Sequence, residues 1–101
     1  MARLVVTKLA EADLAGILAG VASEAGVGTA EKYCARFESF FDRLSVYPES
    51  YPTRPSLGSH IRVGVVFPYL VIYRHDAAED MIGVLRILHG RRDITRDLLR
   101  A

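Results

Sequence analysis

The second half of the chain carries the clearest alternation of hydrophobic and polar positions. Three runs there are rich in Val and Ile and have the length of strands: 61–67, 70–73 and 81–88. Pro68 separates the first two runs, because proline cannot donate to a strand ladder, and the acidic stretch 76–80 separates the last two. Parallel neighbours would need crossovers of about a dozen residues or more. The pattern therefore predicts a three-stranded antiparallel meander.

The first half predicts a short strand over residues 3–7 and then an amphipathic helix. Thr7 is suited to cap the start of this helix, and Gly26 is suited to end it by taking a left-handed conformation. Apolar residues recur at three- and four-residue spacing between these limits, at Leu14, Ile17, Leu18, Val21, Ala22 and Ala25. Glu11, Asp13 and Glu24 lie off this stripe.

A second amphipathic helix follows closely. We expect residues 27–28 to form the link, Thr29 to cap the helix and Pro48 to stop it. Its apolar stripe consists of Tyr33, Cys34, Phe37, Phe40, Phe41 and Leu44. So short a link implies an antiparallel helical hairpin. The next segment, 48–59, holds three of the four prolines and is expected to be extended or turning.

Together these elements predict an α+β fold with the order strand, helix, helix, strand, strand, strand. The first strand should pair at an edge of the meander, and the helical hairpin should cover one face of the sheet. The other face would then be open, with Val66, Val71 or Val84 exposed, which favours an obligate partner.

Length and composition place the chain among ordinary globular proteins. Its 101 residues, half apolar and a quarter charged, predict one domain over 1–101. No apolar run approaches the roughly 20 residues of a membrane helix, and the first residues do not resemble a signal peptide. The single cysteine predicts a reducing, cytoplasmic setting.

The net charge of +1 hides an asymmetry between the two halves. Residues 1–50 carry five basic and seven acidic side chains, whereas residues 51–101 carry eight and five. From Arg86 onward the sequence has five arginines and only two acidic residues, Asp93 and Asp97. This basic end could meet nucleic acid or an acidic protein surface, or it could be a solvated tail.

Few residues suggest catalysis or cofactor binding. Cys34 lies on an apolar helix stripe and is expected to be a core thiol rather than a nucleophile. His60, His75 and His89 lack the spacing of a metal site, and the glycines form no phosphate-binding loop. We therefore expect no metal and no cofactor.

Arginines interrupt the predicted strands at Arg62, Arg74 and Arg86. If they share one face, that face forms a groove for an acidic or amphipathic partner segment. The alternative is that they lie on the solvent side, where their stems cover apolar neighbours.

Several of these segments resemble one known family when they are taken in order. The segments are VTKLAEADLAGI (6–17), RPSLGSHIRVG (54–64), YLVIYR (69–74) and MIGVLRILHGRRD (81–93). They are similar to the ParE toxins of bacterial type II toxin–antitoxin modules, within the ParE/RelE superfamily, over nearly the whole chain. The most specific part is LRILHGRRD.

The resemblance implies the same fold, a helical hairpin on an antiparallel sheet. It also implies two partners. One is a ParD-like antitoxin, forming a heterodimer or heterotetramer, whose C-terminal segment wraps the helices and the sheet edge. The other is DNA gyrase, the target, which ParE toxins trap on cut DNA. The toxin would act by binding, without sequence-specific contact to nucleic acid.

The RelE-like branch of the superfamily, ribosome-dependent mRNA endonucleases, is the competing interpretation. These enzymes use arginine or lysine together with a C-terminal tyrosine or histidine. Here Leu70 stands where the third strand of that branch commonly has arginine, and no tyrosine follows Tyr73. Arg62, Arg86 and His89 could still form a site. A third alternative is a binding module or degenerate homologue without a target.

Two sets of candidate contacts follow from the gyrase interpretation. The candidate target-binding residues are Arg86, His89, Arg91, Arg92 and Arg96, with Arg100 beyond them. The candidate antitoxin-binding residues are Leu14, Leu18, Val21, Arg62 and Arg74. In the alternative for the basic end, Asp93 caps a short last helix over 94–99 that only packs Leu98 on the body.

Overall fold

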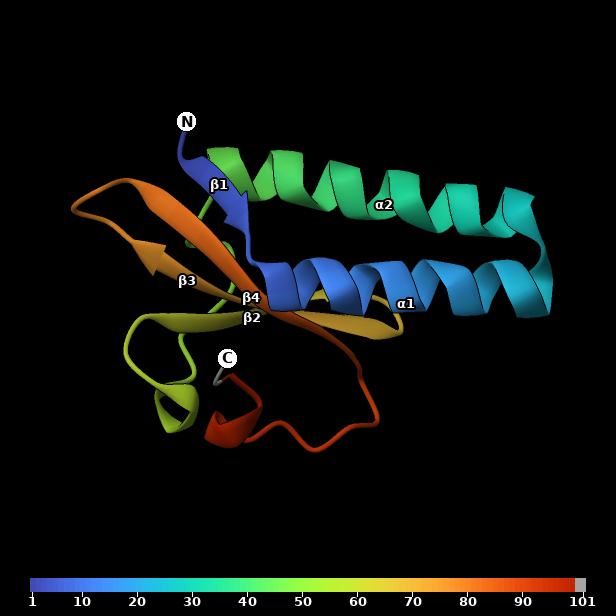
Figure 1. Cartoon of the computed structure of the whole chain (residues 1–101). Helices are drawn as coiled ribbons and strands as arrows, with labels where there is room; N and C mark the ends of the chain where they lie inside the picture. Colours follow the sequence, from blue (N-terminus) through green and yellow to red (C-terminus); the bar gives the residue numbers. More distant parts are fainter. Residues whose placement is uncertain (100–101) are drawn as a thin grey trace.

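The computed structural model describes residues 1–99 and has the predicted order of helices and strands (Figure 1). Arg100, one of the predicted basic residues, lies outside the described part of the chain. The elements are β1 (Arg3–Val6), α1 (Lys8–Ala25), α2 (Val27–Val46), η1 (Pro55–Leu57), β2 (Ile61–Val66), β3 (Tyr69–Asp76), β4 (Met81–His89) and η2 (Arg96–Leu99).

The sheet has the order β1-β4-β3-β2. The meander β2-β3-β4 is antiparallel, as predicted. β1 pairs at an edge of the meander, also as predicted, and that edge is β4. β1 runs parallel to β4, with Arg3 opposite Met81, so the sheet is mixed. A parallel pair needs a long crossover, which the two helices and the first meander strands supply.

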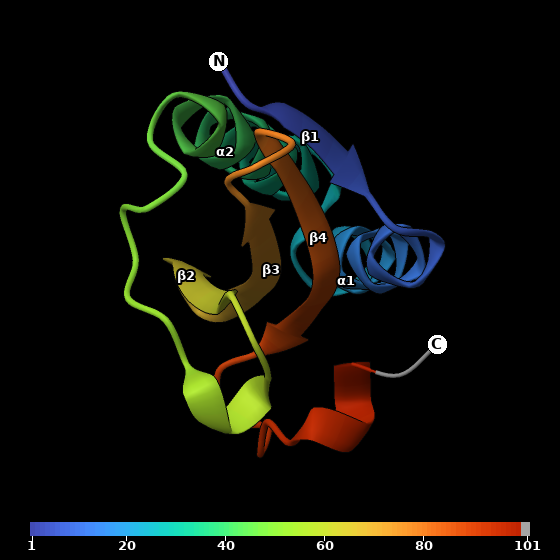
Figure 2. The ribbon, with the colours of Figure 1, turned by 90° about the vertical axis from the view of Figure 1, so that its left-hand side faces the viewer.

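Both helices lie on one face of the sheet (Figures 1 and 2). α2 places Phe37, Phe40 and Leu44 in the core, which confirms these three residues of its predicted stripe. The apolar side chains of the α1 stripe are at most partly buried, and Ala10 is the one fully buried residue of that helix. Within residues 1–99, neither helix combines the length and apolar character needed to cross a bilayer.

The opposite face of the sheet is not open, which corrects the prediction. The buried residues on this side are Leu57 of η1 and Ile61, Ile72 and Leu88 of the sheet. Ile94, Leu98 and Leu99 pack against them. Val66, Val71 and Val84, expected to be exposed, belong to the core beneath the helices and are at most 5% exposed. The C-terminal segment therefore covers a face that the sequence alone left uncovered.

The junction between the helices is shorter than predicted. α2 begins at Val27, so residues 27–28 are not a link and Thr29 is not a cap. Gly26 alone ends α1 and begins α2. Its φ is 94°, a backbone angle that residues with a Cβ rarely adopt. Its N–H donates to Ala22, and its carbonyl accepts the N–H of Ala30.

Thr7 caps α1 as predicted and also binds the sheet. Its hydroxyl accepts the N–H of Ala10 and lies 2.8 Å from the carbonyl of Val84. The pairing of β3 with β4 shifts by one residue here, because Tyr73 lies opposite Val84 and Ile72 lies opposite Arg86. Leu85 is thus the extra residue of a β-bulge.

Candidate functional site

Arg86 on β4 forms an ion pair with Asp13 on α1. Its Nε donates to one carboxylate oxygen at 2.7 Å and its Nη2 to the other at 2.9 Å. The two side chains are only 12% and 14% exposed. The hydrogen-bonded carboxylate raises the pKa of Arg86 above its ordinary value, so this guanidinium stays charged.

The remaining contacts of this pair connect three elements. Arg86 Nη1 donates to the carbonyl of Leu98 in η2 at 2.8 Å. Asp13 also accepts the backbone N–H of Ile87 at 3.0 Å. Arg86, a predicted target-binding residue, therefore directs its donors into the chain itself. Asp13 is not among the residues predicted from the sequence, because it lies off the apolar stripe of its helix.

The other predicted target-binding residues are exposed and close together in the chain. His89 ends β4 and lies edge-on to Tyr69, with 5.7 Å between the ring centroids. Its Nδ1 accepts the N–H of Arg91 at 3.1 Å. We call residues 91–99 the basic C-terminal segment, because it carries exposed Arg91, Arg92 and Arg96. Its helix is a 3₁₀ turn over Arg96–Leu99, shorter than the predicted 94–99.

The three strand arginines do not share a face. Opposite residues of an antiparallel pair project to the same side of a sheet. Arg62 lies opposite Tyr73, whose ring is in the core under the helices. Arg74 lies opposite Ile61, on the other face, and is exposed. The proposed groove of three arginines is therefore not formed.

Arg62 is half buried and contacts residues 48–59, the proline-rich segment. Its Nη1 donates to the carbonyl of Tyr51, and its Nε has no hydrogen-bond partner among the described residues. Thr53 forms a single bridge with Arg62 at the outer edge of β2. The guanidinium thus helps to fix the segment that precedes the strand.

Beyond that bridge, the outer edge of β2 has no strand partner within residues 1–99. The carbonyl of Ile61 faces outward, where it accepts the N–H of Arg54. Because backbone groups of alternate residues point to the same side, those of Val63 and Val65 face outward too. This edge can therefore accept another extended segment.

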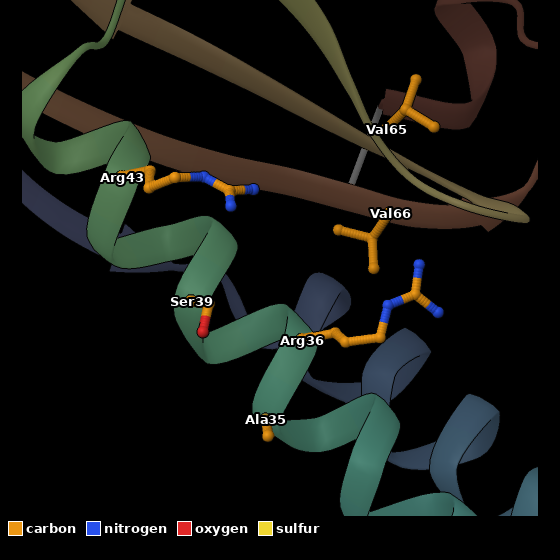
Figure 3. Close-up of a pocket in the computed structure, with 6 residues that line it drawn as sticks. All are labelled: Ala35, Arg36, Ser39, Arg43, Val65 and Val66. Carbon is orange, nitrogen blue, oxygen red and sulfur yellow. The ribbon is translucent and has the colours of Figure 1, made fainter.

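A groove of about 270 Å³ runs between α2 and this edge (Figure 3). Its lining residues are Ala35, Arg36, Ser39, Arg43, Val65 and Val66. Arg36 and Arg43 extend from α2 toward β2, and Arg36 Nη2 donates to the carbonyl of Phe67 at 2.9 Å. Phe67 is 75% exposed. The groove could not be predicted from the sequence, because it depends on how α2 is placed against the edge strand.

The predicted antitoxin contacts on α1 differ in burial. Leu14 packs against the main core, next to Ile17. Leu18 and Val21 are partly buried and lie outside both core clusters. They form an apolar strip on α1 that the chain itself does not fully cover.

The remaining candidates for chemistry do not assemble into a site. Cys34 is partly exposed rather than in the core, and its thiol donates to Glu38 at 3.5 Å. That hydrogen bond, with some desolvation, raises the pKa of Cys34, which disfavours the thiolate. His75 is buried, 4.0 Å from Glu49 and 3.9 Å from Asp80. The described residues hold no group of three side chains suited to a metal ion.

Comparison with known proteins identifies the family. The model of the ParE toxin family, described as the ParE toxin of the type II toxin–antitoxin system parDE, matches residues 4–94. The chain belongs to the ParE toxin family. Toxin ParE3 of Caulobacter vibrioides is 35% identical over 98 residues, which cover 97% of this chain and 96% of that relative.

Solved structures of the ParE and RelE toxin classes have the same fold. A structure of the chromosomal ParDE system of P. aeruginosa matches with a TM-score of 0.71 at 24% identity, covering 88% of this chain and 96% of that one. The RelBE2 toxin–antitoxin complex of Mycobacterium tuberculosis matches with a TM-score of 0.57 at 24% identity, covering 87% and 96%. Both likenesses concern the fold.

Proposed function

We propose that this ParE-family toxin arrests growth by binding DNA gyrase and blocking replication, without enzymatic activity. The observation that carries the proposal is the family match over residues 4–94 together with the 35% identity to Toxin ParE3. The whole chain is then one toxin domain that acts in the cytoplasm.

The arrangement of the arginines favours binding over RNA cleavage. A nuclease site would need Arg62, Arg86 and His89 to converge on one phosphate. Arg62 is instead held against Tyr51 on the helix side of the sheet. Arg86 is held by Asp13 and Leu98, and the Nδ1 of His89 accepts the N–H of Arg91. The RelE-like alternative therefore has less support, although the fold is common to both branches.

The target surface in this proposal is the basic C-terminal segment with His89. Arg91, Arg92 and Arg96 are exposed and add positive charge at one end of the molecule. The DNA bound to gyrase offers phosphate groups, which such a patch attracts. Arg86 supports this surface from beneath by holding Leu98.

The antitoxin in this proposal is ParD-like and binds two places that the chain leaves uncovered. The apolar strip at Leu18 and Val21, beside Leu14, suits the apolar face of a helix. The outer edge of β2 suits an extended segment, and acidic side chains on that segment would meet Arg36 and Arg43. Arg62 and Arg74 lie on the strands nearest this edge.

A paired assay tests the target. Purified protein is added to gyrase in supercoiling and DNA-cleavage reactions, and in parallel to translating ribosomes with a defined mRNA. We expect loss of supercoiling with accumulation of linear DNA, intact mRNA, and reversal of the effect by the ParD-like antitoxin. Cleaved mRNA with normal supercoiling would replace the proposal by the nuclease alternative. An effect on topoisomerase IV alone would keep the mechanism and change the target.

A further inference from the structure

We infer that Asp13 is a positioning residue that holds the basic C-terminal segment in place through Arg86. The role of that segment in toxicity rests on the proposed function, whereas the positioning itself can be tested without a target. Neither the family match nor the relatives assign a role to Asp13.

The guanidinium of Arg86 binds two elements of the chain at once. Two of its nitrogens, Nε and Nη2, donate to both oxygens of Asp13, which fixes the plane of the group. In that orientation the third nitrogen, Nη1, reaches the carbonyl of Leu98 at 2.8 Å. One side chain of β4 therefore connects helix α1 to η2.

The sheet adds a further contact that fixes Asp13. β1 pairs with β4 only as far as Val6 and Val84, and the chain then turns into α1 after Thr7. Farther along β4, the N–H of Ile87 is bound by Asp13 at 3.0 Å, where a longer β1 would have supplied a carbonyl. The carboxylate thus completes the edge of the sheet while it orients Arg86.

The segment is also attached by the hydrogen bond from the Arg92 N–H to the carbonyl of His89 and by apolar packing. Ile94, Leu98 and Leu99 pack on the second core cluster but stay partly exposed. The hydrogen bond from Arg86 to Leu98 is charge-assisted, and the Arg86 side chain is only 12% exposed. It is therefore stronger than a hydrogen bond between neutral groups in water. Loss of the Asp13 carboxylate would leave Arg86 without its partner, and the guanidinium would turn toward water and release Leu98.

The consequence is that exposed Arg91, Arg92 and Arg96 depend on helix α1 for their placement. Their side chains belong to a segment whose far end is held by Arg86, and Arg86 is oriented by a residue of α1. The same helix carries Leu18 and Val21, the apolar strip proposed for the antitoxin.

The test compares Asp13→Asn with Glu11→Gln, a matched loss of one carboxylate on the same helix, where Glu11 is exposed. Hydrogen exchange is measured on the full chain, with the N–H of Leu98, bonded to Thr95, as the reporter. Trypsin cleavage after Arg91, Arg92 and Arg96 is measured alongside. In Asp13→Asn we expect both rates to rise about tenfold or more in the segment, as for loss of a charged hydrogen bond, with α2 unchanged.

A second variant covers the case in which Asp13→Asn fails to fold. Arg86→Lys keeps the charge opposite Asp13, but a single ammonium cannot span both Asp13 and Leu98 as the guanidinium does. It should release the segment selectively, and its control is Arg3→Lys at an exposed position of β1.

Equal protection of the segment in Asp13→Asn and Glu11→Gln would overturn the inference. So would faster exchange spread evenly over α2 and the sheet, since Asp13 would then serve only general stability. Growth arrest is scored with the same variants. Release of the segment with undiminished growth arrest would confirm the positioning and remove the segment from the proposed target surface.

Discussion

The hydroxyl of Tyr73 donates a hydrogen bond of 2.9 Å to the carbonyl of Pro48, which ties the proline-rich segment to the centre of the sheet. The Tyr73 side chain is fully buried, and this burial raises its pKa to about 12. Replacing Tyr73 by Phe should lower the free energy of unfolding by about 1 kcal/mol, because the hydrogen bond is lost. Urea denaturation at neutral pH measures this change.

The same residue predicts a pH dependence. Above a pH of about 10, the unfolded chain releases the Tyr73 proton more readily than the folded chain does, so the unfolded state binds fewer protons. The free energy of unfolding should therefore be fully retained below pH 10 and decline toward about 12. Tyr73→Phe should flatten that decline, whereas Tyr47→Phe, at a side chain 67% exposed, should not. Equal declines in both variants would contradict the assignment to Tyr73.

Gly64 is required by close packing between β2 and α2. A Cβ built on it would lie 2.5 Å from Phe40 Cζ and 3.0 Å from Tyr51 Cε2. Gly64→Ala should therefore lower the free energy of unfolding by about 1–3 kcal/mol through overpacking. Gly83→Ala is the control, because a Cβ there meets nothing within 4 Å. Thermal melts that give the two variants the same loss would refute this explanation.

Charge reversal of the basic C-terminal segment should separate the two proposed binding surfaces. Arg91→Glu with Arg92→Glu is expected to weaken supercoiling inhibition by at least about tenfold, because attraction to the target is replaced by repulsion. Antitoxin binding should stay unchanged in calorimetry. Lys8→Glu with Lys32→Glu reverses two exposed charges elsewhere and controls for net charge. Full inhibition by the Arg91 and Arg92 variant would rule out this surface.

The apolar strip on α1 should matter for the antitoxin and not for folding. Leu18→Asp with Val21→Asp places two charges where an apolar partner face would bury them, so affinity for the ParD-like antitoxin should fall by about a hundredfold or more. The melting temperature should change little, since both side chains are only partly buried and lie outside the core clusters. Ala19→Asp, at an exposed position of α1, is the control. Undiminished affinity would move the antitoxin to another surface.

The fold could be predicted from the sequence to the extent that local periodicity determines it. The stripe through Phe37, Phe40 and Leu44 predicts a helix and its buried face, because these residues recur at helical spacing. The helix junction was predicted less well. Gly26 alone ends one helix and starts the next, and no residue type signals that a one-residue connection will be used in preference to residues 27–28.

The candidate site depended more on contacts that are distant in sequence. Asp13 looks like an ordinary solvated residue until α1 is placed beside β4, 73 positions farther along. A signal was nevertheless present, because an arginine flanked by apolar strand residues, such as Arg86, needs a carboxylate partner when it is buried. The groove at Arg36 and Arg43 had no such signal, since it is formed by the placement of a helix against the free strand edge.

The parallel pairing of β1 with β4 sets an order of events during synthesis. Arg3–Val6 is made well before its partner Met81–Val84, because both helices, β2 and β3 lie between them in the chain. Until that partner emerges, the strand next to the N-terminus has nothing to pair with, and Ala2 and Ala10 lack the core around Ile82 and Val84. Contacts this far apart in sequence close late in folding. A chain made only as far as β3 therefore lacks the folded toxin, and any activity that depends on the fold arises only after β4 has been made.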